Sequence, residues 1–229
     1  MNIVKRVAFA ADFDAFFQPI VNARTGRIHH YEALARFPGA DAALTPHDHI
    51  SLAEQTGLIT VFDMAMVRKM IAWLGGQSLR GQSLRDPPVR VAVNAFLQRL
   101  RRQGCLDDFG AGAATFEYLS SLDVDIVKLD GAWLHGARAT SAGEGFLREL
   151  IGLCRELGVT TVAEMIEDEA AFDFARGCGV TYVQGFLFGE PARDIGAFRD
   201  SIPARLFLPK PAAPAPQQRR MRIASARRG

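Results

Sequence analysis

The chain has 229 residues, of which 48% are hydrophobic and 23% charged, as is typical of a soluble globular protein with one sizeable core. The formal net charge of +2 is too small to favour nucleic acid as a partner, and no apolar run of about 18 residues predicts a membrane span. The first apolar run is too short, and is broken too early by Asp12, for us to expect a secretion signal. Cys105, Cys154 and Cys178 have no metal-ligand spacing, which indicates buried thiols in a reducing cytoplasm.

The first part of the chain predicts two paired strands. Phe16–Val21 is a short apolar run that ends at a polar turn, residues 22–26, and Ile28–Phe37 reads as the returning strand. Alternation divides the second strand into two faces: Glu32, Leu34 and Arg36 on one, and Ala33 and Ala35 on the other. Because Pro19 has no N–H to donate to a neighbouring strand, we expect it in a strand at the edge of the sheet or at a strand's start.

Two helices are expected next. Thr45 suits the N-cap and Pro46 the first helical position of one helix, and Leu58–Leu74 carries apolar residues at helical spacing in the other. Two identical pentapeptides, Gly76–Arg80 and Gly81–Arg85, follow the second helix. Their polar composition predicts a surface loop.

The rest of the chain alternates between strand and helix. Strands are predicted at Val89–Val93, Asp125–Leu129, Val159–Ala163 and Val180–Val183, and helices at Phe96–Arg102, Phe116–Leu122, Gly145–Leu157 and Glu167–Arg176, the last of them ended by Gly177. This order predicts a parallel sheet with right-handed crossovers, either open or closed into a barrel. Residues 206–229 are rich in Pro, Ala, Gln and Arg, so we expect a disordered tail after one domain of residues 1–205.

Two adjacent carboxylates, Asp107 and Asp108, follow an apolar pair and precede a glycine-spaced loop, residues 109–112. Neighbouring carboxylates repel each other unless a cation or a hydrogen-bond donor compensates them. Where a buried strand meets a loop, such a pair indicates a hard cation such as Mg²⁺. A solvated turn is the alternative, because Asp and Gly are common turn residues.

Seven polar residues share one property, which is a position at or near the C-terminal end of a predicted strand. They are Glu32, Asn94, Asp107, Asp108, Lys128, Glu164 and Gln184. In a β/α barrel these ends converge on one mouth, where the active site lies. Four acids, amides and an amine in that position predict a cation site with a further base or charge-stabilising group.

The order of motifs resembles one known family. The motifs are Gln18–Val21, Glu32–Arg36, Ala53–Glu54, Gly57–Ile59, Val93–Asn94, Asp107–Gly112, Val124–Asp130, Ala163–Glu167 and Gln184–Gly185. Together they resemble the EAL-domain family, the bacterial cyclic di-GMP phosphodiesterases, from about Phe13 to Phe198. The resemblance implies an α/β fold, a TIM-type β/α barrel with an antiparallel first strand pair. It also implies Mg²⁺ or Mn²⁺ as cofactor and hydrolysis of cyclic di-GMP to linear pGpG.

The resemblance also assigns roles to residues. Glu32, Asn94, Asp107 and Asp108 match metal ligands, and Arg36 matches a phosphate contact. Lys128 and Glu164 match the groups that position and activate the attacking water, and Gln184 a substrate-side or water-orienting amide. The chemistry agrees, because cations and a lysine offset charge that develops on phosphorus.

The chain departs from the family pattern in two main places. The family has a further strand with a Glu-x-x-Glu element between the Val-Asn and Asp-Asp motifs, whereas residues 95–104 here contain no acid. We therefore expect a barrel truncated by about one strand–helix unit, without one metal-binding Glu. The second departure is Met165, where the family usually has a glycine that allows close approach or positive φ.

Two functions follow from the resemblance. One is a metal-dependent cyclic di-GMP phosphodiesterase of the EAL type, impaired by the missing strand. The alternative is a catalytically degenerate EAL module that binds cyclic di-GMP or a protein partner in signal transduction. A protein partner or a homodimer is consistent with both, and neither needs DNA or a membrane.

Overall fold

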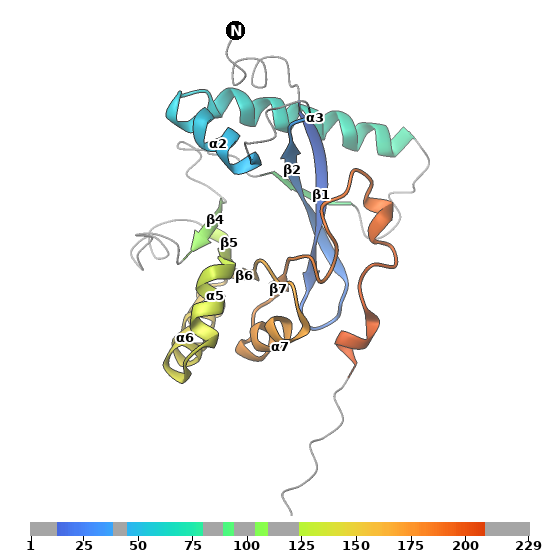
Figure 1. Ribbon diagram of the computed structural model, residues 1–229. Helices are drawn as coiled ribbons and strands as arrows, with labels where there is room; N and C mark the ends of the chain where they lie inside the picture. Colours follow the sequence, from blue (N-terminus) through green and yellow to red (C-terminus); the bar gives the residue numbers. More distant parts are fainter. Residues whose placement is uncertain (1–12, 39–44, 80–88, 94–103, 110–123, 209–229) are drawn as a thin grey trace, which may run out of the picture.

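The computed structural model describes residues 13–38, 45–79, 89–93, 104–109 and 124–208, and a seven-stranded sheet organises this part of the protein (Figure 1). The strands are β1 (Asp14–Asn22), β2 (Ile28–Arg36), β3 (Val91–Val93), β4 (Gly104–Phe109), β5 (Val124–Leu129), β6 (Thr160–Ala163) and β7 (Tyr182–Val183). The helices are α2 (Pro46–Gln55), α3 (Ile59–Leu79), α5 (Gly131–Arg138), α6 (Ser141–Glu156), α7 (Glu169–Cys178), and the 3₁₀ helices η1 (Ile195–Phe198) and η2 (Ala204–Phe207).

The strands follow the order β3-β2-β1-β7-β6-β5-β4 across the sheet. Strand β1 is antiparallel to both of its neighbours, and all other neighbouring strands are parallel. The parallel strands β5, β6 and β7 are joined by helical crossovers, as parallel strands require. This curled mixed sheet with helices outside it fits a TIM-like α/β fold.

The position of Pro19 differs from the expectation for a strand that contains proline. Strand β1 lies between β2 and β7 rather than at an edge, and Pro19 is in its middle, opposite Tyr31. The Phe17 N–H donates to Ala192 O and the Ala23 N–H to Thr181 O, so alternate residues of β1 face the β7 side. The N–H that Pro19 lacks would point to this side, between those two contacts. The ladder to β2 therefore stays intact.

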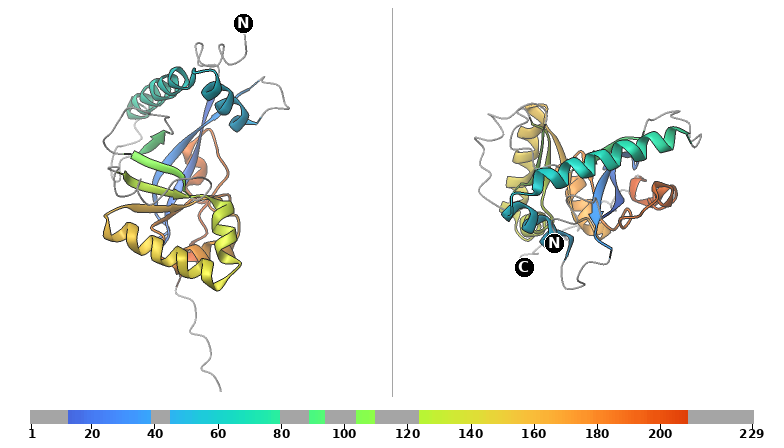
Figure 2. Two further views of the ribbon diagram at one scale, coloured as in Figure 1. Left: turned by 90° about the vertical axis from the view of Figure 1, so that its left-hand side faces the viewer. Right: turned by 90° about the horizontal axis from the view of Figure 1, so that it is seen from above.

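Two apolar cores lie on different parts of the sheet. Helices α5, α6 and α7 bury Leu147, Cys154 and Phe172 against β5, β6 and β7. Helix α3 buries Phe62 and Met66 against the alanine face of β2, as its spacing predicts. In Figure 2, α3 and α6 lie at opposite ends of the molecule with the strands between them.

Several helix boundaries differ from the sequence prediction. Helix α3 extends to Leu79, so most of the first pentapeptide repeat is helical rather than part of a loop. Helix α7 continues past Gly177 to Gly179, which ends it in the left-handed conformation with φ of 95°. Helix α5 was not predicted, although Asp130 caps it by accepting hydrogen bonds from the N–H groups of Ala132 and Trp133.

Thr45 and Pro46 begin α2 as predicted, with a capping box that involves Asp48. The expected helices at residues 96–102 and 116–122 lie outside the described residues. The expected disordered tail, residues 206–229, is wrong in its first residues, because it begins inside η2, where Leu206 is buried in the core and Phe207 packs near Gly26. Residues 209–229 lie outside the described residues. Among the helices that are described, none combines the length and apolar character that a membrane span requires.

Candidate active site

A network of hydrogen bonds and ion pairs joins five polar side chains: Gln18, Glu32 and Lys128 lie in β1, β2 and β5, and Glu164 and Gln184 directly follow β6 and β7. Lys128 Nζ lies 2.9 Å from Glu32 Oε1 and 2.6 Å from Glu164 Oε1. On the other side of Glu32, Gln184 Nε2 donates to Glu32 Oε2 and, at 2.9 Å, to Gln18 Oε1. The Gln18 side chain in turn donates to Gly189 O at 3.2 Å. The structure thus brings four of the predicted site residues, Glu32, Lys128, Glu164 and Gln184, into one network.

The backbone fixes these side chains at the ends of the parallel strands. The Glu164 N–H donates to Leu129 O at 3.1 Å, and the Gln184 N–H donates to Ala163 O at 2.9 Å, which extends the sheet ladder by one residue at each strand end. A Cβ atom on Gly185 would lie 2.1 Å from Ile166 O. Glycine is therefore required after Gln184, because the loop that follows Glu164 approaches the backbone closely.

The network lines a cavity of about 350 Å³ with a strongly acidic wall. Its acids are Glu32, Asp130, Glu164 and Glu167, whereas Lys128 is its one cation among the described residues. Glu32 and Lys128 are only 3% and 5% exposed, so water screens their charges weakly. An excess of carboxylates in a partly dehydrated cavity attracts a cation.

The two aspartates of the predicted metal site lie on β4, next to β5. Leu106 pairs with Val127 and Phe109 with Leu129, so two residues of β4, Asp107 and Asp108, stand opposite the single residue Lys128. This bulge places the aspartate backbone beside the network, and bulges are common next to active sites. The structure does not describe the two aspartate side chains, and Asn94 lies outside the described residues.

Arg36 is farther along β2 than the network. It shares the face of Glu32 and Leu34, but it lines a neighbouring cavity with Asp14, Phe16 and Arg193. Its Nη1 donates to Ala35 O at 2.9 Å, and its guanidinium lies 5.7 Å from the centre of the Phe16 ring. Burial lowers the pKa of Arg36 below its ordinary value, and the negative charge of Glu32 acts in the opposite direction.

Met165 borders the acidic cavity in a strained conformation. Its φ is 53°, and it is the single non-glycine residue with positive φ among the described residues. A side chain in this region costs about 1–2 kcal/mol relative to glycine. Met165 is also 60% exposed, and a Cβ atom on Gly131 would lie 2.3 Å from Met165 Cβ. The methionine is thus accommodated at the rim because residue 131 is a glycine.

The residues of the network fit a hard divalent cation by their donor chemistry. Gln184 Oε1 is buried and has no hydrogen-bond partner among the described residues, and it lines the same cavity as the carboxylates of Glu32 and Glu164. Buried acceptors normally have partners, so this oxygen indicates a missing donor or cation. Mg²⁺ and Mn²⁺ prefer such oxygen ligands. The described side chains do not by themselves gather three metal-ligating His, Cys, Asp or Glu residues, so the aspartates of β4 would have to complete the site.

Sequence reasoning gave no role to Gln18, which joins the network through Gln184. A signal was present, because Gln18 is the polar residue within the apolar run Phe16–Val21. Its cross-strand partner is Glu32, so the two side chains share one face of the β1–β2 pair. A buried glutamine in that position holds the Gln184 amide and thereby orients its free oxygen.

One known family matches the sequence over most of its length. The EAL domain family model matches residues 5–95 and 88–191. The chain is 33% identical over 113 residues to "Cyclic di-GMP phosphodiesterase PdeB" of Shewanella oneidensis, covering 48% of this chain and 13% of that protein. It is 25% identical over 226 residues to "Cyclic di-GMP phosphodiesterase PdeL" of Escherichia coli, covering 79% of this chain and 62% of the relative.

A solved structure described as "PaMucR Phosphodiesterase, c-di-GMP complex" is also similar to this chain. The TM-score is 0.63 and the identity 25%, with 82% of this chain and 95% of the other covered. By contrast, the chain spans 13% to 62% of the lengths of the two curated relatives. The similarity therefore concerns one domain of those proteins.

Proposed function

We propose that this chain, which belongs to the EAL domain family, binds cyclic di-GMP and hydrolyses one phosphodiester bond to give linear pGpG. The observation that supports this most is the buried contact of Lys128 with Glu32 and Glu164 in an acidic cavity at the strand ends. The two curated relatives above are named as cyclic di-GMP phosphodiesterases, and PaMucR was solved with the dinucleotide.

In this proposal Glu32, Asn94, Asp107 and Asp108 would hold Mg²⁺ or Mn²⁺. When bound, the cation polarises a phosphoryl oxygen and lowers the pKa of an attacking water. Cation and cavity are matched in charge, because the described carboxylates outnumber the single lysine.

The remaining residues act on water and substrate. Glu164 accepts a proton from the attacking water as general base, and its ion pair with Lys128 holds the carboxylate in place. The Gln184 oxygen, fixed by Gln18 and Glu32, accepts a hydrogen bond from water or substrate. Arg36 donates to a phosphate oxygen from the neighbouring cavity, which continues the same face of β2.

We further propose that one strand–helix unit of the family barrel is absent. Strands β3 and β4 are the two ends of the seven-stranded sheet, and ten residues, 94–103, connect them. A parallel crossover through a helix and a further strand needs more residues than this. The missing Glu-x-x-Glu strand would remove a metal ligand, so we expect slow hydrolysis that demands a high metal concentration.

The second candidate function is a degenerate EAL module that binds cyclic di-GMP, or a protein partner, without turnover. The lack of an acid in residues 95–104 favours this candidate. Both candidates place the chain in cytoplasmic signalling, and the buried, unpaired thiols of Cys154 and Cys178 fit a reducing compartment.

An assay that scores binding and hydrolysis separately distinguishes the candidates. The purified chain is titrated with cyclic di-GMP in a calorimeter, and pGpG is measured by chromatography with Mg²⁺ or Mn²⁺. We expect Asp107→Asn and Glu164→Gln to abolish hydrolysis, because an amide is a poorer ligand for a hard cation and cannot act as the base. Arg36→Ala should weaken binding at least tenfold, whereas the matched variants Glu149→Gln and Arg24→Ala change exposed residues outside these cavities.

Binding without pGpG would establish the degenerate module. No binding by a folded protein would refute both candidates that use the dinucleotide. Brisk hydrolysis that survives Asp107→Asn would show that the reaction does not use the aspartates of β4.

A further inference from the structure

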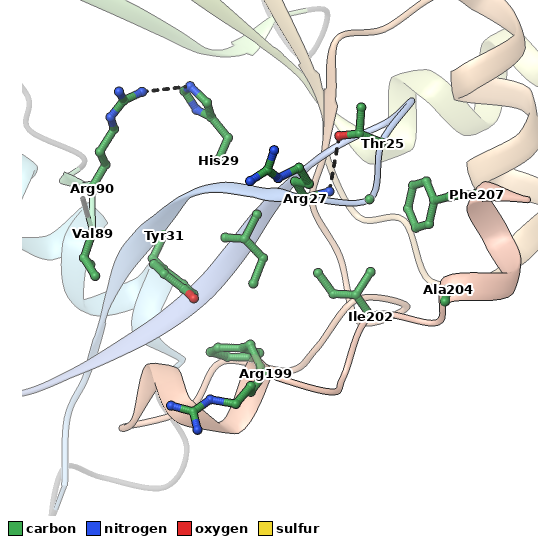
Figure 3. Close-up of a pocket in the computed structure, with 13 residues that line it drawn as sticks. Thr25, Arg27, His29, Tyr31, Val89, Arg90, Arg199, Ile202, Ala204 and Phe207 are labelled. Carbon is green, nitrogen blue, oxygen red and sulfur yellow. Dashed lines mark hydrogen bonds between the residues drawn. The ribbon is translucent and has the colours of Figure 1, made fainter. Parts of the chain in front are cut away.

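A second cavity, of about 560 Å³, lies on another part of the molecule (Figure 3). It is bounded by the turn between β1 and β2, the residues that precede β3, and the segment that contains η1 and η2. It shares no lining residue with the acidic cavity. Its volume is in the range of cavities that bind small organic ligands.

The wall of this arginine cavity is basic. Arg27, Arg90 and Arg199 line it, and none of the described residues that line it is an acid. These guanidinium groups form no ion pair within the described part of the chain. In Figure 3 Arg27, His29 and Arg90 lie along one side, and Arg199 lies on the other. Guanidinium groups without carboxylate partners bind phosphate well, because their donors match its oxygens.

A bulge in β2 sets the geometry of the side formed by Arg27, His29 and Arg90. The strand register shifts by one residue between Ile20 and Val21, so His29 is the extra residue of β2. Arg90 Nη1 donates to His29 Nε2 at 3.2 Å, and His29 Nδ1 lies 2.8 Å from His30 Nδ1. Burial, followed by the charge of Arg90, lowers the pKa of His29, which fits a neutral ring that accepts from Arg90. Arg90 is therefore oriented by a neutral partner, and no ion pair among the described residues offsets its charge.

The rest of the wall is mainly apolar. Tyr31, Phe198, Ile202 and Phe207 present rings and an aliphatic side chain to the cavity. Phe207 packs under Gly26, whose φ is 71° and where a Cβ atom would lie 2.7 Å from the Phe207 ring. This wall suits a flat aromatic or apolar body.

We propose that the arginine cavity binds an organic phosphate of nucleotide size. Its phosphate lies against Arg27 and Arg90, and its ring against the apolar wall. The combination favours a nucleotide over inorganic phosphate, because both parts of the wall are then occupied. This site is separate from the one proposed to bind cyclic di-GMP, since the two cavities have no lining residue in common.

The test uses calorimetry on the purified chain without divalent metal, with 5′-AMP and 5′-GMP as probes. Adenosine and inorganic phosphate are measured separately, because they represent the nucleoside part and the phosphate part of 5′-AMP. We expect at least one nucleotide to bind, and each half to bind at least tenfold more weakly. Arg27→Ala and Arg90→Ala should each weaken nucleotide binding at least tenfold. Both residues are exposed, so the variants should fold, which a thermal melt verifies.

Two control variants separate this site from other sources of affinity. Arg24→Ala removes an exposed arginine from the same turn but outside the cavity, and Arg36→Ala affects the site proposed for cyclic di-GMP. Neither should change nucleotide affinity by more than twofold. The proposal is overturned if neither nucleotide binds at millimolar concentration, or if Arg27→Ala and Arg90→Ala bind as the parent does. It is equally overturned if only Arg36→Ala loses binding, and that result would place the nucleotide beside Arg36.

Discussion

The acidic cavity and the arginine cavity differ in how their charged side chains are paired and exposed. In the acidic cavity Lys128 is buried between Glu32 and Glu164, and each of these charges has a partner. In the arginine cavity the guanidinium groups are exposed, and none of the described residues that line the cavity is an acid. A buried charge must be compensated within the fold, whereas an exposed arginine can remain hydrated until an anion binds. Substitutions in the first cavity should therefore affect stability, and those in the second mainly ligand affinity.

The largest effect is expected from Lys128→Met. The substitution preserves much of the side-chain volume but leaves Glu32 buried beside Glu164 without the ammonium group. Removing one partner of a buried ion pair typically costs about 3–5 kcal/mol in the free energy of unfolding. Urea unfolding at pH 7 without metal measures this loss. Arg148→Met is the matched control, because its pair with Glu144 is exposed and water screens it, so this substitution should cost far less than Lys128→Met even though it also removes the Arg148 contact with Gly177 O.

A double-mutant cycle tests whether compensation of charge is the cause. Combining Lys128→Met with Glu32→Gln removes the more buried of the two carboxylate charges that lose the ammonium group, so the double variant should lose less stability than the two single losses added together. Additive losses would show that Lys128 stabilises the fold by packing alone, and the contrast between the cavities would then not concern charge.

The second prediction concerns His30, which contacts His29 of the arginine cavity and lies near Glu32 of the acidic one. Burial, followed by the charge of His29, lowers the pKa of His30 from 6.5 to about 4. The folded state therefore favours the neutral ring. This contribution to stability is complete above pH 6.5 and is lost as the pH falls toward 4, by about 3 kcal/mol.

Urea unfolding of the parent and of His30→Gln at pH 7 and pH 4 isolates this residue. Other acids also titrate in this range, so the informative quantity is the difference between the two pH profiles. The parent should lose about 3 kcal/mol more than the variant between these pH values. Parallel profiles would mean that folding does not lower the pKa of His30. The pair of His29 and His30 would then not be a neutral boundary between the two cavities.

Local patterns predicted much of the fold and part of the acidic cavity. The alternation in β2 placed Glu32 and Leu34 on the face that lines this cavity and Ala33 in the apolar core, because strand periodicity depends only on the chain itself. The position of Lys128 and Glu164 near strand ends likewise predicted that they meet.

Features that depend on neighbouring elements could not be predicted. Pro19 is tolerated in an inner strand because of the hydrogen bonds that the N–H groups of Phe17 and Ala23 donate across the sheet. The bulge at His29 is a property of the pairing with β1, and the contact with Arg90 joins residues 61 positions apart. The sequence alone therefore does not predict the arginine cavity, because only the fold brings its residues together.

A smaller effect is expected at the rim of the acidic cavity. Met165 has a φ of 53°, which glycine adopts without strain. Met165→Gly should be more stable than Met165→Ala by about 1 kcal/mol, because alanine retains the strain and both remove the long side chain. Urea unfolding of the two variants measures the difference. Equal stabilities would show that the loop relaxes, so that the methionine imposes no strain beside Glu164.

The smallest effect is expected from removing residues 209–229, which lie outside the described residues. Their composition predicts no contribution to a core, so truncation after Leu208 should shift the melting temperature by less than about 1 °C. Nucleotide binding in the arginine cavity should also persist, because its end wall is formed by Phe207. Leu206→Ala in the full chain is the contrasting variant, since Leu206 is buried and a truncated core leucine costs about 2–5 kcal/mol. If truncation alone lowers the melting temperature by several degrees, the tail packs on the domain. Its five arginines, Arg219, Arg220, Arg222, Arg227 and Arg228, would then have to be included in any account of where phosphate binds.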